Sequence, residues 1–154
     1  MGNRRRSREF AMQALFDMDM SLDISPDRFE RFCRNFHPPD RQLPFVRLLV
    51  EGVIQHRQTI DALIEKHASN WKMSRIACVD RNVMRIAVFE MLYCEEIPAK
   101  VAINEAIDIG KRYGTDESGA FINGVLDSIN LAVQKEIEEK QPHSLEPPLK
   151  PNKE

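Results

Sequence analysis

The sequence predicts an all-α protein from the period of its apolar residues and the positions of its prolines and glycines. Apolar residues recur every three or four positions through most of the chain, which is the period of a helix and not the alternation of a strand. Proline and glycine divide the chain into segments of helical length. Of its 154 residues, 42% are hydrophobic, enough to build the core of one folded unit.

Two helices are predicted at the start of the chain. The first extends from about Arg5 to Met20, and one of its sides is apolar: Phe10, Ala11, Ala14, Leu15 and Met18. The second begins after Ser25, whose side chain can cap it, with Pro26 at its first position. It ends at about Asn35, before a run of prolines.

The middle of the chain predicts two helices and a connector. A long helix opens at Pro44 and ends near His67, with a bend expected at residues 58–59. Residues 71–75 form the connector. The segment 79–94 carries apolar residues almost all round its circumference, so we expect it in the centre of a bundle.

Two further helices complete the predicted domain, residues 1–140. An amphipathic helix covers 100–113, with Gly114 as its stop, and a helix over 118–140 carries one apolar stripe. The remaining residues, 141–154, hold four prolines and few apolar side chains. This composition predicts a flexible tail.

Composition excludes several classes of protein. The net charge is −2, so a nucleic-acid site must be a local patch and not a uniformly basic surface. No apolar run reaches the length of a membrane span and no secretion signal is present, which predicts a cytoplasmic protein.

The cysteines and histidines do not predict a metal, a cofactor or catalysis. Cys33, Cys78 and Cys94 are far apart, and no histidine lies at metal-ligand spacing from another histidine or a cysteine. We expect reduced, mostly buried thiols. An enzyme using Cys78 or Cys94 with a histidine is an alternative, but neither cysteine has a recognisable nucleophile context and no nucleotide-binding glycine motif is present.

The first predicted helix carries a local basic patch: Arg4, Arg5, Arg6 and Arg8. At about 100° per residue, Phe16 and Gln13 fall with Arg5 and Arg6 on the side opposite the apolar stripe. An exposed ring beside guanidinium groups suits single-stranded RNA, because bases stack on the ring and arginines neutralise phosphates. The helical wheel equally allows Phe16 to pack against another helix, with the arginines forming a solvated terminus.

A second group lies around the turn between the last two helices. Lys111, Arg112 and Tyr113 end one helix, and Phe121 follows soon after the next begins. We expect this junction beside the first helix. Phe121 is at the margin of the apolar stripe, so it can stack a base or fix the interhelix angle, and its position alone favours packing.

Three segments resemble the NusB family. Residues 4–9 and 13–16 are similar to the opening of NusB proteins, and Asp80, residues 83–87 and Glu90 resemble the central helix. The longest similarity is to the C-terminal signature: residues 100–107, Lys111, Tyr113, Gly114 and residues 121–127. The resemblance covers about residues 4–127, with a variable region at 21–40.

The resemblance implies two small helical bundles packed together and a non-enzymatic transcription antitermination factor. Such a factor binds the boxA segment of ribosomal RNA leaders with NusE, a small-subunit ribosomal protein, and joins other Nus factors and RNA polymerase. The RNA surface would comprise Arg4, Arg5, Arg6, Arg8, Gln13, Phe16, Lys111, Glu117 and Phe121. The NusE-facing surface would include His67, Asp80 and Arg81.

Two positions depart from the family pattern. Relatives usually carry a phenol where this chain has Phe16, and a basic residue where it has Ala120. A protein-only helical interaction module without RNA binding is the alternative function. The sequence leaves the oligomeric state open, a homodimer included.

Overall fold

The computed structural model describes residues 3–69 and 71–140, and within them it contains seven α-helices, one short 3-10 helix and no strand. This confirms the predicted all-α class. The elements are α1 (Asn3–Ser21), α2 (Pro26–Phe36), α3 (Leu43–Gln55), α4 (Arg57–His67), η1 (Met73–Arg75), α5 (Cys78–Tyr93), α6 (Ala99–Tyr113) and α7 (Ser118–Lys140). The predicted tail, 141–154, lies outside the described residues.

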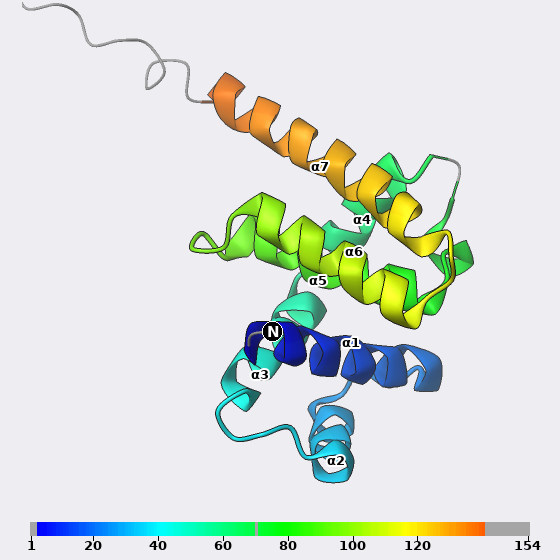
Figure 1. Cartoon of the computed structure of the whole chain (residues 1–154), viewed down its shortest axis with the longest axis vertical. Coiled ribbons are helices and arrows are strands. Elements are labelled where there is room, and N and C mark those ends of the chain that lie inside the picture. The colour runs from blue at the N-terminus through cyan, green and yellow to red at the C-terminus, as the bar shows by residue number, and fades with distance from the viewer. Residues whose placement is uncertain (1–2, 70, 141–154) are drawn as a thin grey trace, which may run out of the picture.

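The helices form two bundles that share α5. In Figure 1, α1 packs against α2 and α3 in one bundle, and α4, α6 and α7 surround α5 in the other. Helix α5 contacts α1 and α3 as well, so it joins the bundles and is buried almost all round. The two-bundle architecture and the central position of this helix were both predicted.

Local hydrogen bonds mark the starts of α2 and α7, and the one at α2 was predicted. Ser25 caps α2, since its hydroxyl accepts a hydrogen bond from the backbone N–H of Arg28 at 3.2 Å. Thr115 similarly accepts from the N–H of Glu117 at 3.3 Å, just before α7. No helix of the described segments is long and apolar enough to cross a membrane.

The predicted long helix from Pro44 to His67 is instead two helices, α3 and α4, separated at His56. The break comes two residues before the expected bend. Helix α3 packs on α1 and α4 packs on α7, so the chain changes direction as it passes from one bundle to the other. Helical periodicity continues on both sides of His56, which is why the apolar pattern does not reveal the break.

A glycine sets how closely α3 approaches α5. A Cβ atom built at Gly52 would lie 2.2 Å from the Phe89 ring, a distance no real Cβ adopts. The absence of a side chain therefore lets the ring of Phe89 pack directly on the α3 backbone. This contact fixes the central helix against the bundle that carries α1.

Candidate nucleic-acid interface

The arginines at the start of α1 occupy two kinds of environment, and the first is internal. Arg8 is buried, and its Nε and Nη2 donate to the two carboxylate oxygens of Glu90 at 2.7 and 3.0 Å. Arg5 is half-buried and donates to Glu105 at 2.7 Å and to Asp108 at 2.8 Å. Most N–H groups of these two arginines are therefore engaged by carboxylates of α5 and α6.

Arg4 and Arg6 lie on the outside. The Arg4 guanidinium stacks over the Phe45 ring, 4.1 Å from its centroid. The Arg6 side chain is 50% exposed and donates one hydrogen bond to Glu9 at 2.9 Å. Stacking and a single ion pair hold these guanidiniums in place and leave N–H groups directed to solvent.

The pKa values of Glu90 and Glu105, the two carboxyl groups paired with Arg8 and Arg5, shift in opposite directions. Burial raises the pKa of Glu90, and the hydrogen bonds from Arg8 counteract that rise. The hydrogen bond from Arg5 lowers the pKa of Glu105, which is less buried. Arg8 thus compensates a carboxylate in the interior and links α1 to α5.

Phe16 and Gln13 line an open groove on the surface of α1. The groove has a volume of about 450 Å³, and the other residues along it are Met12, Asp17, Met20, Phe32, Phe36, Val79 and Tyr113. The ring of Phe16 is 37% exposed. It is not sealed beneath another helix, so a base can reach it.

The junction of α6 and α7 lies beside α1, as predicted. Arg112, at the end of α6, donates to Glu9 of α1 at 3.4 Å, and Tyr113 lines the groove. The exposed Lys111 extends its stem over Gly119, where an added Cβ would be 2.8 Å from the Lys111 Cε atom. We did not predict a site role for Arg112 or Tyr113, although both directly follow Lys111 in the sequence.

Glu117 and Phe121 line a separate cavity with Asp80. Its volume is about 290 Å³, and the half-exposed Trp71 forms another side of it. Asp80 is buried, and its Oδ1 atom has no hydrogen-bond partner among residues 3–69 and 71–140. Burial raises the pKa of Asp80. Trp71 was predicted only as part of a connector. It lines a cavity that contains both predicted RNA-binding residues and a predicted partner-binding residue.

The other two predicted partner residues make internal contacts. The Nδ1 atom of His67 is 2.7 Å from the Ser128 hydroxyl, which joins α4 to α7. Arg81 donates to Asp19 at 2.9 Å and to the Met73 carbonyl at 2.8 Å. Neither His67 nor Arg81 lines the Asp80 cavity.

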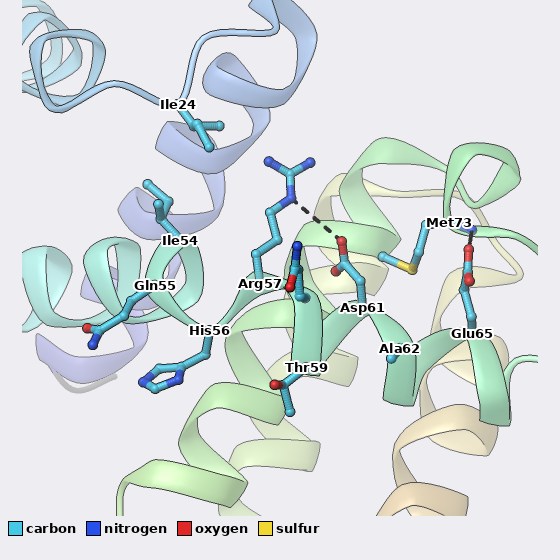
Figure 2. Close-up of a pocket in the computed structure, with 11 residues that line it drawn as sticks. Ile24, Ile54, Gln55, His56, Arg57, Thr59, Asp61, Ala62, Glu65 and Met73 are labelled. Atoms are coloured by element: carbon cyan, nitrogen blue, oxygen red, sulfur yellow. Dashed lines mark hydrogen bonds and ion pairs between the residues drawn. The ribbon is translucent and has the colours of Figure 1, made fainter.

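A larger cavity, about 780 Å³, lies elsewhere, along α4 beside the α3–α4 break (Figure 2). Arg57 faces Asp61 at 3.6 Å, and Glu65 accepts a hydrogen bond from the Met73 backbone at 2.7 Å. Arg57 and Asp61 thus pair with each other, and Glu65 is engaged by a backbone N–H group. Across the described part of the chain, no group of three or more histidine, cysteine or acidic side chains is arranged to bind a metal.

The cysteines in this structure are free thiols. Cys94 is buried, whereas Cys33 and Cys78 are half-buried. Burial raises the pKa of Cys94 to about 11, and it also raises the pKa values of Cys33 and Cys78. A raised thiol pKa disfavours the thiolate, so these environments do not activate a nucleophile.

The chain is similar to proteins of a known family. Residues 5–131 match the model of the NusB family. The transcription antitermination protein NusB of Desulfatibacillum aliphaticivorans is 53% identical over 136 residues, covering 88% of this chain and 95% of the relative. That of Desulfosudis oleivorans is 52% identical over 133 residues, covering 84% and 86%.

Solved structures agree with the sequence relatives. T. maritima NusB superposes with a TM-score of 0.75 at 35% identity, covering 88% of this chain and 96% of that one. A chain from a crystal structure of the antitermination factors NusB and NusE in complex with double-stranded RNA gives a TM-score of 0.76 at 26% identity, covering 86% and 98%.

Proposed function

Because this chain belongs to the NusB family of transcription antitermination proteins, we propose that it binds boxA-type single-stranded RNA in ribosomal RNA leader transcripts. It does so together with NusE, and it supports processive transcription of ribosomal RNA with other Nus factors and RNA polymerase. The RNA is held and not altered covalently.

One observation carries the RNA proposal: an exposed aromatic ring, Phe16, lies in an apolar groove on the same helix as the exposed guanidiniums of Arg4 and Arg6. Stacking of a base on such a ring supplies about 1–3 kcal/mol, and arginines add a salt-dependent attraction to phosphates. Of the predicted arginines, Arg4 and Arg6 have N–H groups free for phosphate. Arg8 acts mainly as an internal link, and Arg5 contributes through the 20% of its side chain that is exposed.

The cavity formed by Asp80, Trp71 and Phe121 is the proposed contact with NusE. Its buried, unpaired carboxylate oxygen favours a partner that inserts a hydrogen-bond donor, and Trp71 offers a large apolar contact of the kind that anchors interfaces. Phe121 then lies where the RNA and NusE surfaces meet. Binding of NusE beside the RNA strengthens weak RNA contacts by raising their effective concentration.

The test measures binding of a fluorescein-labelled boxA-type single-stranded RNA by fluorescence anisotropy, with and without NusE, at several salt concentrations. If about three phosphates are contacted, the logarithm of the affinity falls against the logarithm of the salt concentration with a slope of roughly −2. An unlabelled duplex of the same sequence serves as competitor, since the related NusB and NusE structure contains double-stranded RNA.

Variants separate RNA binding from a protein-only role. Phe16→Ala should weaken RNA binding about fivefold or more, because the stacking surface is lost. Tyr93→Ala is the matched control, since Tyr93 is a similarly exposed ring outside the groove. RNA affinity that is absent, independent of salt or unchanged by Phe16→Ala contradicts RNA recognition at this surface and favours a protein-only adaptor.

A further inference from the structure

The groove beside Phe16 extends onto α2, which lies in the variable region of the family resemblance. We propose that it holds one unstacked base of the bound RNA between Phe16 of α1 and Phe36 of α2, while Arg6 and Arg112 grip a neighbouring phosphate. This inference rests on the proposed function and adds a base site and a phosphate clamp to it. Phe36 lies in the variable region, and no role was predicted for it.

The shape of the groove fits a base. Its volume of about 450 Å³ lies in the range of pockets that hold small ligands, roughly 300–1,000 Å³. Phe36 is 57% exposed, yet its ring is held in place because it stacks on the buried Phe32, with centroids 4.6 Å apart. One face of Phe36 is thus supported by α2, and the ring is available to contact a ligand without a large loss of side-chain freedom.

The polar groups along the groove suit a base and not a bare cation. The Gln13 side chain has both donor and acceptor atoms, as hydrogen bonding to a base edge requires. Asp17, which would repel a phosphate, is engaged by Arg28 through two hydrogen bonds of 2.8 and 2.9 Å. The negative charge nearest the groove is therefore already compensated.

Two arginines from different helices share one carboxylate at the edge of the groove. Glu9 is buried and accepts from Arg6 at 2.9 Å and from Arg112 at 3.4 Å, although these arginine side chains are 50% and 60% exposed. Two positive charges against one negative leave a net positive site with N–H groups directed outward. The Arg112 guanidinium also lies 5.5 Å from the centroid of Tyr113, which lines the groove, so the clamp and the groove are continuous.

Charge favours RNA over a second copy of this chain as the occupant. In a twofold-symmetric dimer the same surface meets itself. A dimer built on this groove would bring two net-positive clamps together, and like charges at an interface cost binding energy. A polyanion with exposed bases matches both the aromatic groove and the clamp.

The base site is tested with a set of labelled boxA-type RNAs in which each base in turn is replaced by an abasic site. We expect one position at which base removal weakens wild-type binding about fivefold or more, but has little further effect in Phe36→Ala. Tyr93→Ala should retain the full loss at that position. Equal losses in wild type and Phe36→Ala at every position would overturn the base site.

The clamp is tested by comparing Arg112→Gln with Arg34→Gln. Both substitutions remove one positive charge, but Arg34 is an exposed residue of α2 that does not line the groove and forms no ion pair with a described residue. Arg112→Gln should weaken RNA binding several-fold and reduce the magnitude of the salt slope by about 0.7, whereas Arg34→Gln should change neither. Equal effects would show general electrostatic attraction and overturn the clamp.

The controls distinguish the two levels of proposal. If wild-type protein binds no RNA with or without NusE, the proposed function fails. If wild type binds but Phe36→Ala and Arg112→Gln do too with unchanged affinity, only the base site and clamp fail. Light scattering during size-exclusion chromatography checks the other occupant: a dimer that Phe36→Ala dissociates, without a change in RNA affinity, would assign the groove to a second copy.

Discussion

Arginines in the interior and arginines at the surface differ in how many N–H groups remain free after pairing with carboxylates of this chain. In the interior, Arg85 is buried and donates to Asp61 at 2.8 and 3.0 Å and to Asp19 at 3.1 Å. At the surface, Arg6 and Arg112 share the single carboxylate of Glu9. The interior arginines use their donors to hold helices together, whereas the surface arginines, at 50% and 60% exposure, leave donors accessible to solvent.

Arg6 and Arg8 show the same contrast two residues apart in one helix. Arg8 points into the bundle and pairs with Glu90, while Arg6 lies on the outside above Phe10. Counting the arginines of the sequence therefore overestimates how many guanidinium groups are accessible to a phosphate. Burial and the supply of carboxylates decide which arginines are available to phosphate.

The largest expected effect comes from removing a buried arginine. Arg8→Ala should lower the free energy of unfolding by about 3–5 kcal/mol, because Glu90 is left as an uncompensated buried carboxyl group. Urea denaturation measures it. Adding Glu90→Gln to Arg8→Ala should recover part of the loss. A change below about 1 kcal/mol would show that Arg8 is not an internal link and would return it to the RNA surface.

Asp19, which pairs with the interior arginines Arg81 and Arg85, makes their contribution to stability depend on pH. Burial alone would raise its pKa, but the hydrogen bond from Asn82 and the charges of Arg85 and Arg81 outweigh burial and lower it below 3.8. A carboxyl group with a lowered folded-state pKa stabilises the protein above its unfolded pKa and loses that contribution as pH falls through the folded value.

Asp19→Asn should therefore destabilise the protein at neutral pH, by about 1–3 kcal/mol, and less at acidic pH. Urea denaturation of both proteins at neutral pH and below pH 3.8 measures the difference. Convergence of the two stabilities in acid is the expected result. A difference that stays constant with pH would mean that Asp19 contributes through packing and not through its charge.

Much of the fold was predictable because its signals are local. Apolar periodicity, the Ser25 cap and the stop at Gly114 depend on neighbours within a turn or two, and these boundaries agree with the structure to within about two residues. The break at His56 was not placed correctly, because it depends on the two bundles that α3 and α4 join.

The candidate site was only partly predictable because its pairings are long-range. A helical wheel correctly assigns Phe16 to an exposed side, but it contains no information on Glu90, which is 82 residues from Arg8. Arg112 reaches Glu9 across 103 positions. The wheel does place Arg8 on the side of Ala11 and Leu15 and Arg6 on the opposite side, but it gives no carboxylate partner for Arg8. Nothing in the local pattern brings Trp71 to Asp80 and Phe121.

Removing the exposed Arg6 should have the opposite outcome to removing the buried Arg8: little change in stability and weaker RNA binding. Arg6→Gln should lower the free energy of unfolding by no more than about 1 kcal/mol, since the Arg6 side chain is 50% exposed and the buried Glu9 keeps its ion pair with Arg112. RNA affinity should fall several-fold, with a salt slope smaller in magnitude by about 0.7. Arg34→Gln again controls for lost charge. Substantial destabilisation without weaker RNA binding would reverse the assignment of Arg6.

The smallest expected effect is a change in RNA affinity that comes from the groove alone and not from the charge of the arginines. Phe16→Tyr adds the hydroxyl that the family resemblance leads us to expect at this position and keeps the stacking surface, and the exposure of the ring leaves the new hydroxyl solvated. We expect RNA affinity to rise by about twofold to fivefold, the range of one modest hydrogen bond, and the change to be independent of salt because no charge is added. Anisotropy titrations at low and high salt measure it, with Tyr93→Phe as the control for altering an exposed phenol elsewhere. A loss of affinity in Phe16→Tyr would mean that the ring is enclosed when RNA is bound, since a hydroxyl group that finds no partner in an enclosed site costs binding energy.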